Sequence, residues 1–110
     1  MEFINSILTW VMKKRIHQIE LFMKYPEEVQ TELLFSLVKR GSGTHYGKQY
    51  GFNGIKNYKD FSNNVPIVTY EDLFPYVERL MKGEQNVLWP TEVRWFAKSS
   101  GTTNSRSKFI

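Results

Sequence analysis

The residues best suited to chemistry lie near the end of the chain, where hydroxyl side chains gather around one glycine. They form the run Ser99-Ser100-Gly101-Thr102-Thr103, and two cationic side chains, Arg106 and Lys108, follow it. Glycine lets a backbone turn closely around an anion, hydroxyl groups donate hydrogen bonds to phosphate oxygens, and lysine adds positive charge. The pattern is typical of a phosphate-binding loop, although such clusters also occur in plain surface loops.

An apolar, aromatic run leads into this loop. It covers residues 93–97, and we expect a strand over residues 91–97. A buried strand that ends in a loop of small residues presents backbone N–H groups to phosphate. An isolated strand would also have an unpaired edge, so we expect that the chain can self-associate there.

Composition limits the class of protein. A chain of 110 residues is one domain at most, and with 41% hydrophobic and 15% aromatic residues it can bury a core. It has no cysteine, which excludes disulfides and thiolate metal sites and fits a reducing compartment. The net charge of +4 is spread along the chain and is compatible with anionic ligands, but no nucleic-acid-binding motif accompanies it.

Membrane attachment is not expected either. The longest apolar-leaning stretch, residues 3–12, is interrupted by polar side chains and is far shorter than the ~20 residues that span a bilayer. It also lacks the basic start and the cleavage site of a signal peptide. An amphipathic helix lying on a membrane surface is the alternative, but its polar face carries no long basic array. We therefore expect a cytoplasmic protein that binds neither membrane nor nucleic acid.

Two helices are predicted at the start of the chain. Apolar residues recur at steps of three and four from residue 3 to residue 24. Pro26 suits the first position of a second helix, which should end near Arg40 with Gly41 beyond it. The tight turn between the helices predicts an antiparallel helical hairpin over residues 3–40.

The next segment, residues 41–54, is rich in glycine but does not fit a known nucleotide loop. A triphosphatase loop needs serine or threonine after Gly47-Lys48, and Gln49 stands there instead. A dinucleotide fingerprint would need a preceding strand, and a helix precedes. We expect a loop with a short helical turn. His45, like His17, has no second ligand nearby, so neither is predicted to bind a metal or to act in catalysis.

Two shorter helices should follow. One lies within residues 55–64, and an extended piece over 65–68 comes after it. The next helix should cover residues 70–81, with Thr69 as its N-cap and Asp72 in its first turn. Pro75 is tolerated because it lies in the early turns, and Gly83 ends the helix. The predicted layout is thus the hairpin over 3–40, a loop and helices over 41–83, and a strand with a phosphate loop over 91–108.

Several stretches, taken together and in order, resemble one family. The loop runs Ser-Ser-Gly-Thr-Thr, then four residues, then Lys108, which is similar to the phosphate-binding loop of the acyl-adenylate-forming enzymes. Within that superfamily the chain most resembles the GH3 family of acyl acid–amido synthetases, and especially its bacterial members. The stretches that carry the resemblance are residues 44–52, the segments Asp60-Phe61, Val65-Pro66-Ile67 and Tyr70-Glu71-Asp72-Leu73, and finally Gly83-Glu84, Leu88-Trp89-Pro90 and Phe96 with the loop.

The resemblance implies an ATP-dependent enzyme with an α/β fold, of which this chain is the N-terminal part of the large adenylating domain. The enzyme would use ATP and magnesium to activate a carboxylic acid, and an amine or amino acid would then attack to give an amide. Ser99, Ser100, Gly101, Thr102, Thr103 and Lys108 would bind the phosphates. Many family members have a glycine within the four-residue spacer, where this chain has residues 104–107 without glycine. No catalytic residue and no metal ligand can be assigned within these 110 residues.

The loop stands almost at the end of the chain, so we expect a fragment of a longer enzyme that is mostly α-helical with short β-strands and has no synthetase activity alone. The sequence does not identify the acid or the amine. A second interpretation stays open, in which the chain is a small helical binding module with a disordered Ser/Thr/Gly tail.

Overall fold

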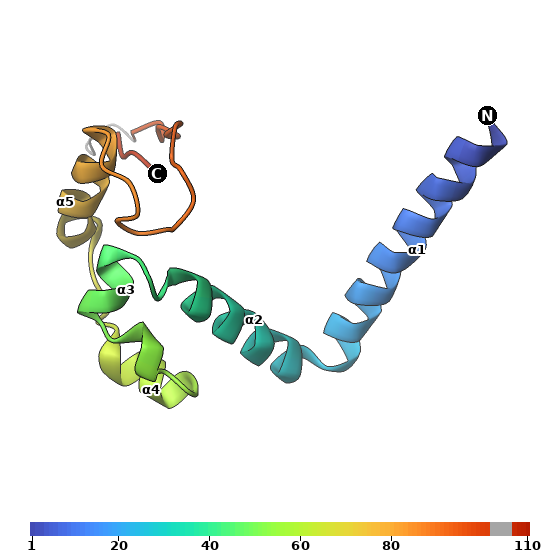
Figure 1. The fold of residues 1–110 in the computed structure, drawn as a ribbon, viewed down its shortest axis with the longest axis horizontal. Helices are drawn as coiled ribbons and strands as arrows, with labels where there is room; N and C mark the ends of the chain where they lie inside the picture. Colours follow the sequence, from blue (N-terminus) through green and yellow to red (C-terminus); the bar gives the residue numbers. More distant parts are fainter. Residues whose placement is uncertain (102–106) are drawn as a thin grey trace. The chain divides into compact units, whose positions relative to one another are not determined.

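Helices make up most of the computed structural model, which describes residues 1–101 and 107–110 (Figure 1). The chain divides into two compact units, Met1–Leu34 and Phe35–Ile110, and the division falls within the second helix. Each unit is described by itself. The mostly helical composition of the fold is as predicted.

The first unit contains α1 (Glu2–Lys24) and the first turns of α2 (Pro26–Gly41). Pro26 has no N–H to leave unpaired at the first helical position, and Tyr25 closes α1 by donating its N–H to the Leu21 carbonyl at 2.8 Å. Both helices are confirmed within a residue or two of their predicted bounds. Their packing as an antiparallel hairpin stays a prediction, because α1 buries none of its residues.

In the part of the chain that the structure describes, no helix has the length and apolar character needed to cross a membrane.

The second unit holds the remaining helices, which are α3 (His45–Gln49), the 3₁₀ turn η1 (Phe52–Gly54), α4 (Tyr58–Asn64) and α5 (Tyr70–Met81). The short helical turn predicted within residues 41–54 is therefore confirmed. Asn57 caps α4, since its side chain accepts a hydrogen bond from the Asp60 amide at 2.9 Å. The cap predicted for α5 is also present, because Thr69 and Asp72 form a reciprocal capping box.

A small core holds the second unit together. Its fully enclosed side chains are Val87 and Thr44, and the other buried apolar residues are Val38, Ile55, Val77 and Leu80. They come from α2, from the segments around α3 and η1, from α5 and from the segment that follows α5. The core thus joins the glycine-rich segment to the long closing segment of the chain.

The strand predicted over residues 91–97 is not formed. Within the described ranges the only strand-like pairing is an isolated antiparallel bridge between Lys98 and Phe109. The physical reason is visible at Val93, whose N–H donates to Oε1 of Gln85 at 2.8 Å and whose carbonyl accepts from Nε2 of Gln85 at 3.3 Å. A side-chain amide thus satisfies the groups that a neighbouring strand would pair, and residues 91–96 stay irregular. Self-association at this segment remains a prediction.

Candidate functional site

The two ends of the hydroxyl-rich loop are paired with each other. Ala97 and Ile110 exchange both backbone hydrogen bonds, at 2.9 and 2.8 Å, and the Ser99 amide donates to the Lys108 carbonyl at 2.8 Å. In Figure 1 the segment after α5 makes a wide turn and comes back to the C-terminus. The predicted phosphate loop is therefore closed at its base by a short antiparallel hairpin, with residues 97–99 as one arm and residues 108–110 as the other.

Ser99 and Lys108 are brought together at this base. The Lys108 amide donates to Oγ of Ser99 at 2.9 Å, so that side-chain hydroxyl takes the place of a backbone carbonyl in the ladder. Ser100 and Gly101 follow Ser99 on an exposed stretch. Thr102 and Thr103, the other two hydroxyl residues of the predicted site, lie outside the described residues, as does Arg106.

Positive charge gathers at the same place. Nζ of Lys108 lies 5.2 Å from the centre of the Tyr70 ring, and Nζ of Lys98 lies 5.7 Å from the centre of the Phe109 ring. Cations in this position over an aromatic face are attracted by the ring quadrupole. Within residues 1–101 and 107–110 the ion pairs are found elsewhere, at Arg79–Glu84, Lys82–Glu78 and Arg94–Glu92. The backbone amides at this base are paired within the chain, so the Ser99 hydroxyl and the Lys108 ammonium group are the groups here that could contact an anionic ligand.

The glycine-rich segment has a different role. At the start of α3 the His45 amide donates to the Asn86 carbonyl at 2.9 Å and the Tyr46 amide donates to the Val87 carbonyl at 3.0 Å. The Gly47 amide donates to the buried hydroxyl of Thr44 at 2.9 Å. These first-turn donors are the groups that would bind a phosphate, and each is already used. The segment links the start of α3 to residues 86–87 by backbone hydrogen bonds, and we call this contact the α3 joint. This structural role is compatible with the interpretation of the segment as no nucleotide loop.

Aromatic rings surround this joint. Tyr46 packs against Tyr50 with ring centres 4.5 Å apart and against the edge of Tyr76 at 5.2 Å. Burial, with a smaller contribution from the charge of Tyr76, raises the pKa of the Tyr46 hydroxyl above its usual value. The Tyr46 hydroxyl therefore keeps its proton at neutral pH.

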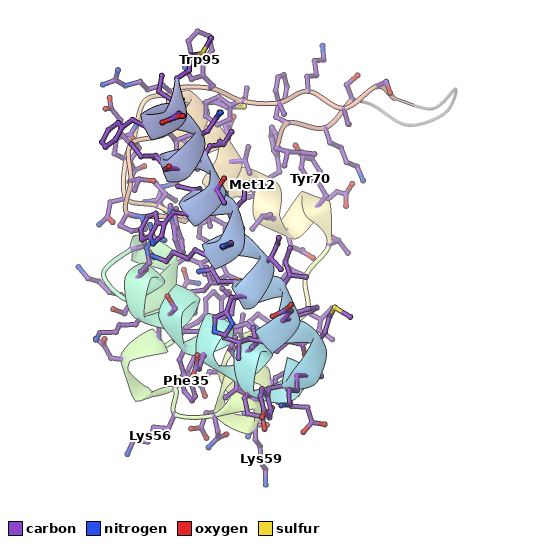
Figure 2. The ribbon with its side chains drawn as sticks, turned by 90° about the vertical axis from the view of Figure 1, so that its right-hand side faces the viewer. Met12, Phe35, Lys56, Lys59, Tyr70 and Trp95 are labelled. Atoms are coloured by element: carbon purple, nitrogen blue, oxygen red, sulfur yellow. The ribbon has the colours of Figure 1, made fainter. Side chains whose placement is uncertain are left out.

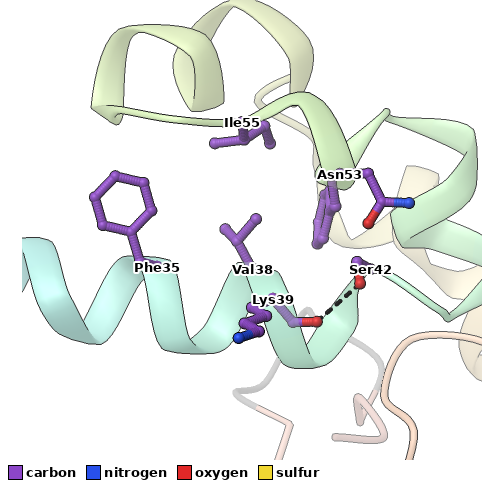
Figure 3. Close-up of a pocket in the computed structure, with 7 residues that line it drawn as sticks. Phe35, Val38, Lys39, Ser42, Asn53 and Ile55 are labelled. Atoms are coloured by element: carbon purple, nitrogen blue, oxygen red, sulfur yellow. Dashed lines mark hydrogen bonds between the residues drawn. The ribbon is translucent and has the colours of Figure 1, made fainter.

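A hollow lies between the end of α2 and η1 (Figure 3). It has a volume of about 240 Å³, and Figure 3 shows the side chains of Phe35 and Val38 on one side facing Ile55 on the other. The hydroxyl of Ser42 at its edge is already used, because it donates to the Lys39 carbonyl at 2.8 Å. The lining of the hollow mixes apolar side chains with Lys39, Ser42 and Asn53.

Sequence reasoning missed two residues that shape the site. Tyr70 contacts the closing arm of the hairpin, and Gln85 holds the irregular segment before the loop. The Tyr70 side chain bonds backbone 39 residues away and the Gln85 side chain bonds backbone eight residues away, and no local sequence pattern marks either pairing. For Tyr70 the available signal was its place in the segment Tyr70-Glu71-Asp72-Leu73, one of the stretches that carry the family resemblance.

The chain has recognisable relatives among known proteins. The sequence profile of the GH3 family N-terminal domain matches residues 15–110, and so the chain belongs to the GH3 family. Among its relatives is a jasmonoyl–L-amino acid synthetase of Nicotiana attenuata, which is 34% identical over 96 residues. Another is an indole-3-acetic acid-amido synthetase of Arabidopsis thaliana, which is 34% identical over 98 residues. These alignments cover 86% and 88% of this chain but only 17% and 18% of the relatives, so the chain spans less than a fifth of their length.

Proposed function

We propose that this chain is the N-terminal part of an ATP-dependent acyl acid–amido synthetase and that it supplies the loop that holds the ATP phosphates. The whole enzyme would have the α/β fold of the acyl-adenylate-forming enzymes. It would join a carboxylic acid to ATP as an acyl-adenylate, with release of pyrophosphate, and an amine or amino acid would then attack the acyl carbon and release AMP. The cytoplasm, which supplies ATP, is the expected compartment.

The observation that carries the proposal is the closed base of the loop. Ser99 and Lys108 are nine residues apart in the sequence, yet the amide of Lys108 bonds to the hydroxyl of Ser99 at 2.9 Å. A loop that is pinned at both ends can hold its donors in place before the ligand arrives, which lowers the ordering cost of binding. Membership of the GH3 family and the names of its relatives support the same activity.

Each residue of the loop has a role in this proposal. Hydroxyl groups of Ser99, Ser100, Thr102 and Thr103 donate hydrogen bonds to phosphate oxygens, and Gly101 lets the backbone approach them closely. Lys108 carries positive charge to the β- and γ-phosphates, which leave as pyrophosphate. The contribution to catalysis is positional and electrostatic, and none of these residues acts as a nucleophile.

Magnesium is part of the proposal as a companion of ATP. The described residues contain no group of three His, Asp or Glu side chains that could hold a metal ion by themselves. Magnesium would enter with the nucleotide, bound to its phosphate oxygens, as is usual for this ion. Its chemistry when bound is to neutralise part of the phosphate charge, while the chain itself orients the phosphates.

Acid-dependent exchange of pyrophosphate into ATP tests the proposal. The enzyme that contains this chain would be assayed with a panel of carboxylic acids, including jasmonic acid and indole-3-acetic acid, the acids that the relatives' names indicate. We expect exchange with at least one acid and none without acid. The 110-residue chain alone serves as the matched control and should show no exchange, whereas exchange by it would contradict the assignment as one part of a larger site.

A further inference from the structure

The closing arm of the loop is held by one tyrosine hydroxyl from a distant part of the sequence. Oη of Tyr70 donates to the carbonyl of Phe109 at 3.1 Å and accepts from the amide of Phe109 at 2.9 Å. The hydroxyl therefore bonds both backbone groups of a single residue.

The geometry of the hairpin explains why these groups are available. In an antiparallel pair, hydrogen-bonded positions alternate with positions whose N–H and C=O point outward. Ala97 with Ile110 is a hydrogen-bonded position, so Lys98 with Phe109 is an outward-pointing one. The N–H and C=O of Phe109 would need a third strand, and the hydroxyl of Tyr70 supplies both partners in its place.

The same tyrosine lies beside the charged residue of the loop. Nζ of Lys108 is 5.2 Å from the centre of the Tyr70 ring. Tyr70 thus contacts the backbone of Phe109 through its hydroxyl and the ammonium group of Lys108 through its ring face. The first contact holds the backbone next to Lys108, and the second holds its ammonium group.

Tyr70 is itself firmly placed. It is the first residue of α5, directly after the Thr69 cap, and Figure 2 labels it at the start of that helix. Its ring lies 5.9 Å from that of Phe74, one turn further along. α5 is in turn fixed by Val77 and Leu80, each only 7% exposed. A residue on a capped and packed helix is a suitable support for a loop.

We propose that Tyr70 is a positioning residue of the phosphate loop, acting through Lys108. The inference rests on the proposed function of that loop and extends it to a residue outside it. By holding the closing arm, Tyr70 presents the ammonium group of Lys108 to the phosphates before ATP binds.

The first test needs no nucleotide. In Tyr70→Phe the ring stays and both hydrogen bonds are lost, so amide exchange at Phe109, followed by NMR in the 110-residue chain, should become about tenfold faster. Tyr58→Phe is the matched control, because Tyr58 is 72% exposed on α4, and exchange at Phe109 should not change. Equal exchange at Phe109 in the wild type and in Tyr70→Phe would overturn the inference, whatever the enzyme does.

The second test measures whether Tyr70 acts through Lys108. In the whole enzyme, Tyr70→Phe should raise the KM for ATP about tenfold and leave the KM for the acid unchanged. In a Lys108→Ala background the same change should have less than a twofold effect, since coupled residues are not additive. If the effects of the two substitutions on the KM for ATP were fully additive, or if Tyr70→Phe raised the KM for the acid as much as the KM for ATP, Tyr70 would have a general structural role. Either result would overturn the inference. If the wild-type enzyme showed no acid-dependent pyrophosphate exchange, the proposed function would be refuted. That result can be told apart from the outcomes that concern Tyr70.

Discussion

The carbonyl oxygen of Gly41 lies directly against the α-carbon of Gly47. A β-carbon at Gly47 would come within 2.0 Å of that oxygen and within 2.9 Å of the carbonyl carbon. Both obstacles are backbone atoms at the end of α2, so they cannot move aside as a flexible side chain can. The approach of α3 to the end of α2 therefore depends on glycine at this position.

Gly47→Ala should consequently destabilise the second unit by about 3 kcal/mol, the upper part of the range for overpacked sites. The measurement is the free energy of unfolding from urea denaturation. Gly54→Ala is the matched control, because a β-carbon at Gly54 meets nothing within 4 Å and this variant should unfold like the wild type. An equal decrease in the free energy of unfolding in both variants would show that the close approach to Gly41 does not determine the stability.

The hydroxyl of Thr44 is the second test of this joint. It is completely buried, donates to the Gly41 carbonyl at 2.6 Å and accepts from the Gly47 amide at 2.9 Å. Thr44→Val leaves the buried Gly47 amide unpaired and removes one of the two hydrogen bonds to the Gly41 carbonyl, which keeps the Thr44 amide, so it should cost about 2 kcal/mol of unfolding free energy. Thr44→Ser keeps the hydroxyl and loses one methyl group, and should cost about 1 kcal/mol. A serine variant less stable than the valine variant would contradict the role assigned to the hydroxyl.

These residues also show how far the sequence could predict the structure. The stretch from Thr44 to Phe52 was recognised by its resemblance to a family segment, and the structure gives physical reasons for its spacing. Thr44 caps α3, Gly47 allows the close contact with Gly41, and Gly51 has a φ of 64°, which suits glycine. Helices with strong periodicity and good caps were likewise predictable, since their signals are local.

Long-range pairing was not predictable in the same way. Residues 91–97 have the apolar pattern of a strand, but a strand forms only if a partner lies beside it. The partner that Val93 finds is the side chain of Gln85, and among the described residues the only arms that pair are 97–99 and 108–110. The link between Tyr70 and Phe109 joins residues 39 apart in the sequence. Nothing in the local sequence indicates which tyrosine hydroxyl will form hydrogen bonds with which backbone amide and carbonyl.

The cap of α5 predicts a pH dependence. Hydrogen bonds to Asp72 from the backbone of Thr69 first, and from its side chain second, lower the pKa of the Asp72 carboxyl below its usual 3.8. A lowered folded-state pKa means that the stabilisation is fully present above pH 3.8 and is lost as the pH falls through the lower, folded-state value. Thermal unfolding of the wild type and of Asp72→Asn should therefore differ at pH 6 and converge in strong acid. A difference that stays constant from pH 6 to the most acidic condition would rule out this contribution.

Substitution of Lys108 tests the central claim most directly, which is that the loop between Ser99 and Lys108 holds the phosphates of ATP. The matched control is Lys59→Ala, because Lys59 extends from α4 away from the rest of the second unit (Figure 2). The quantity to measure is kcat/KM for ATP in acid-dependent pyrophosphate exchange by the whole enzyme. We expect Lys108→Ala to lower it about 100-fold, as is typical for loss of a charged transition-state contact, and Lys59→Ala to leave it within twofold. An unaltered kcat/KM in Lys108→Ala would contradict the account.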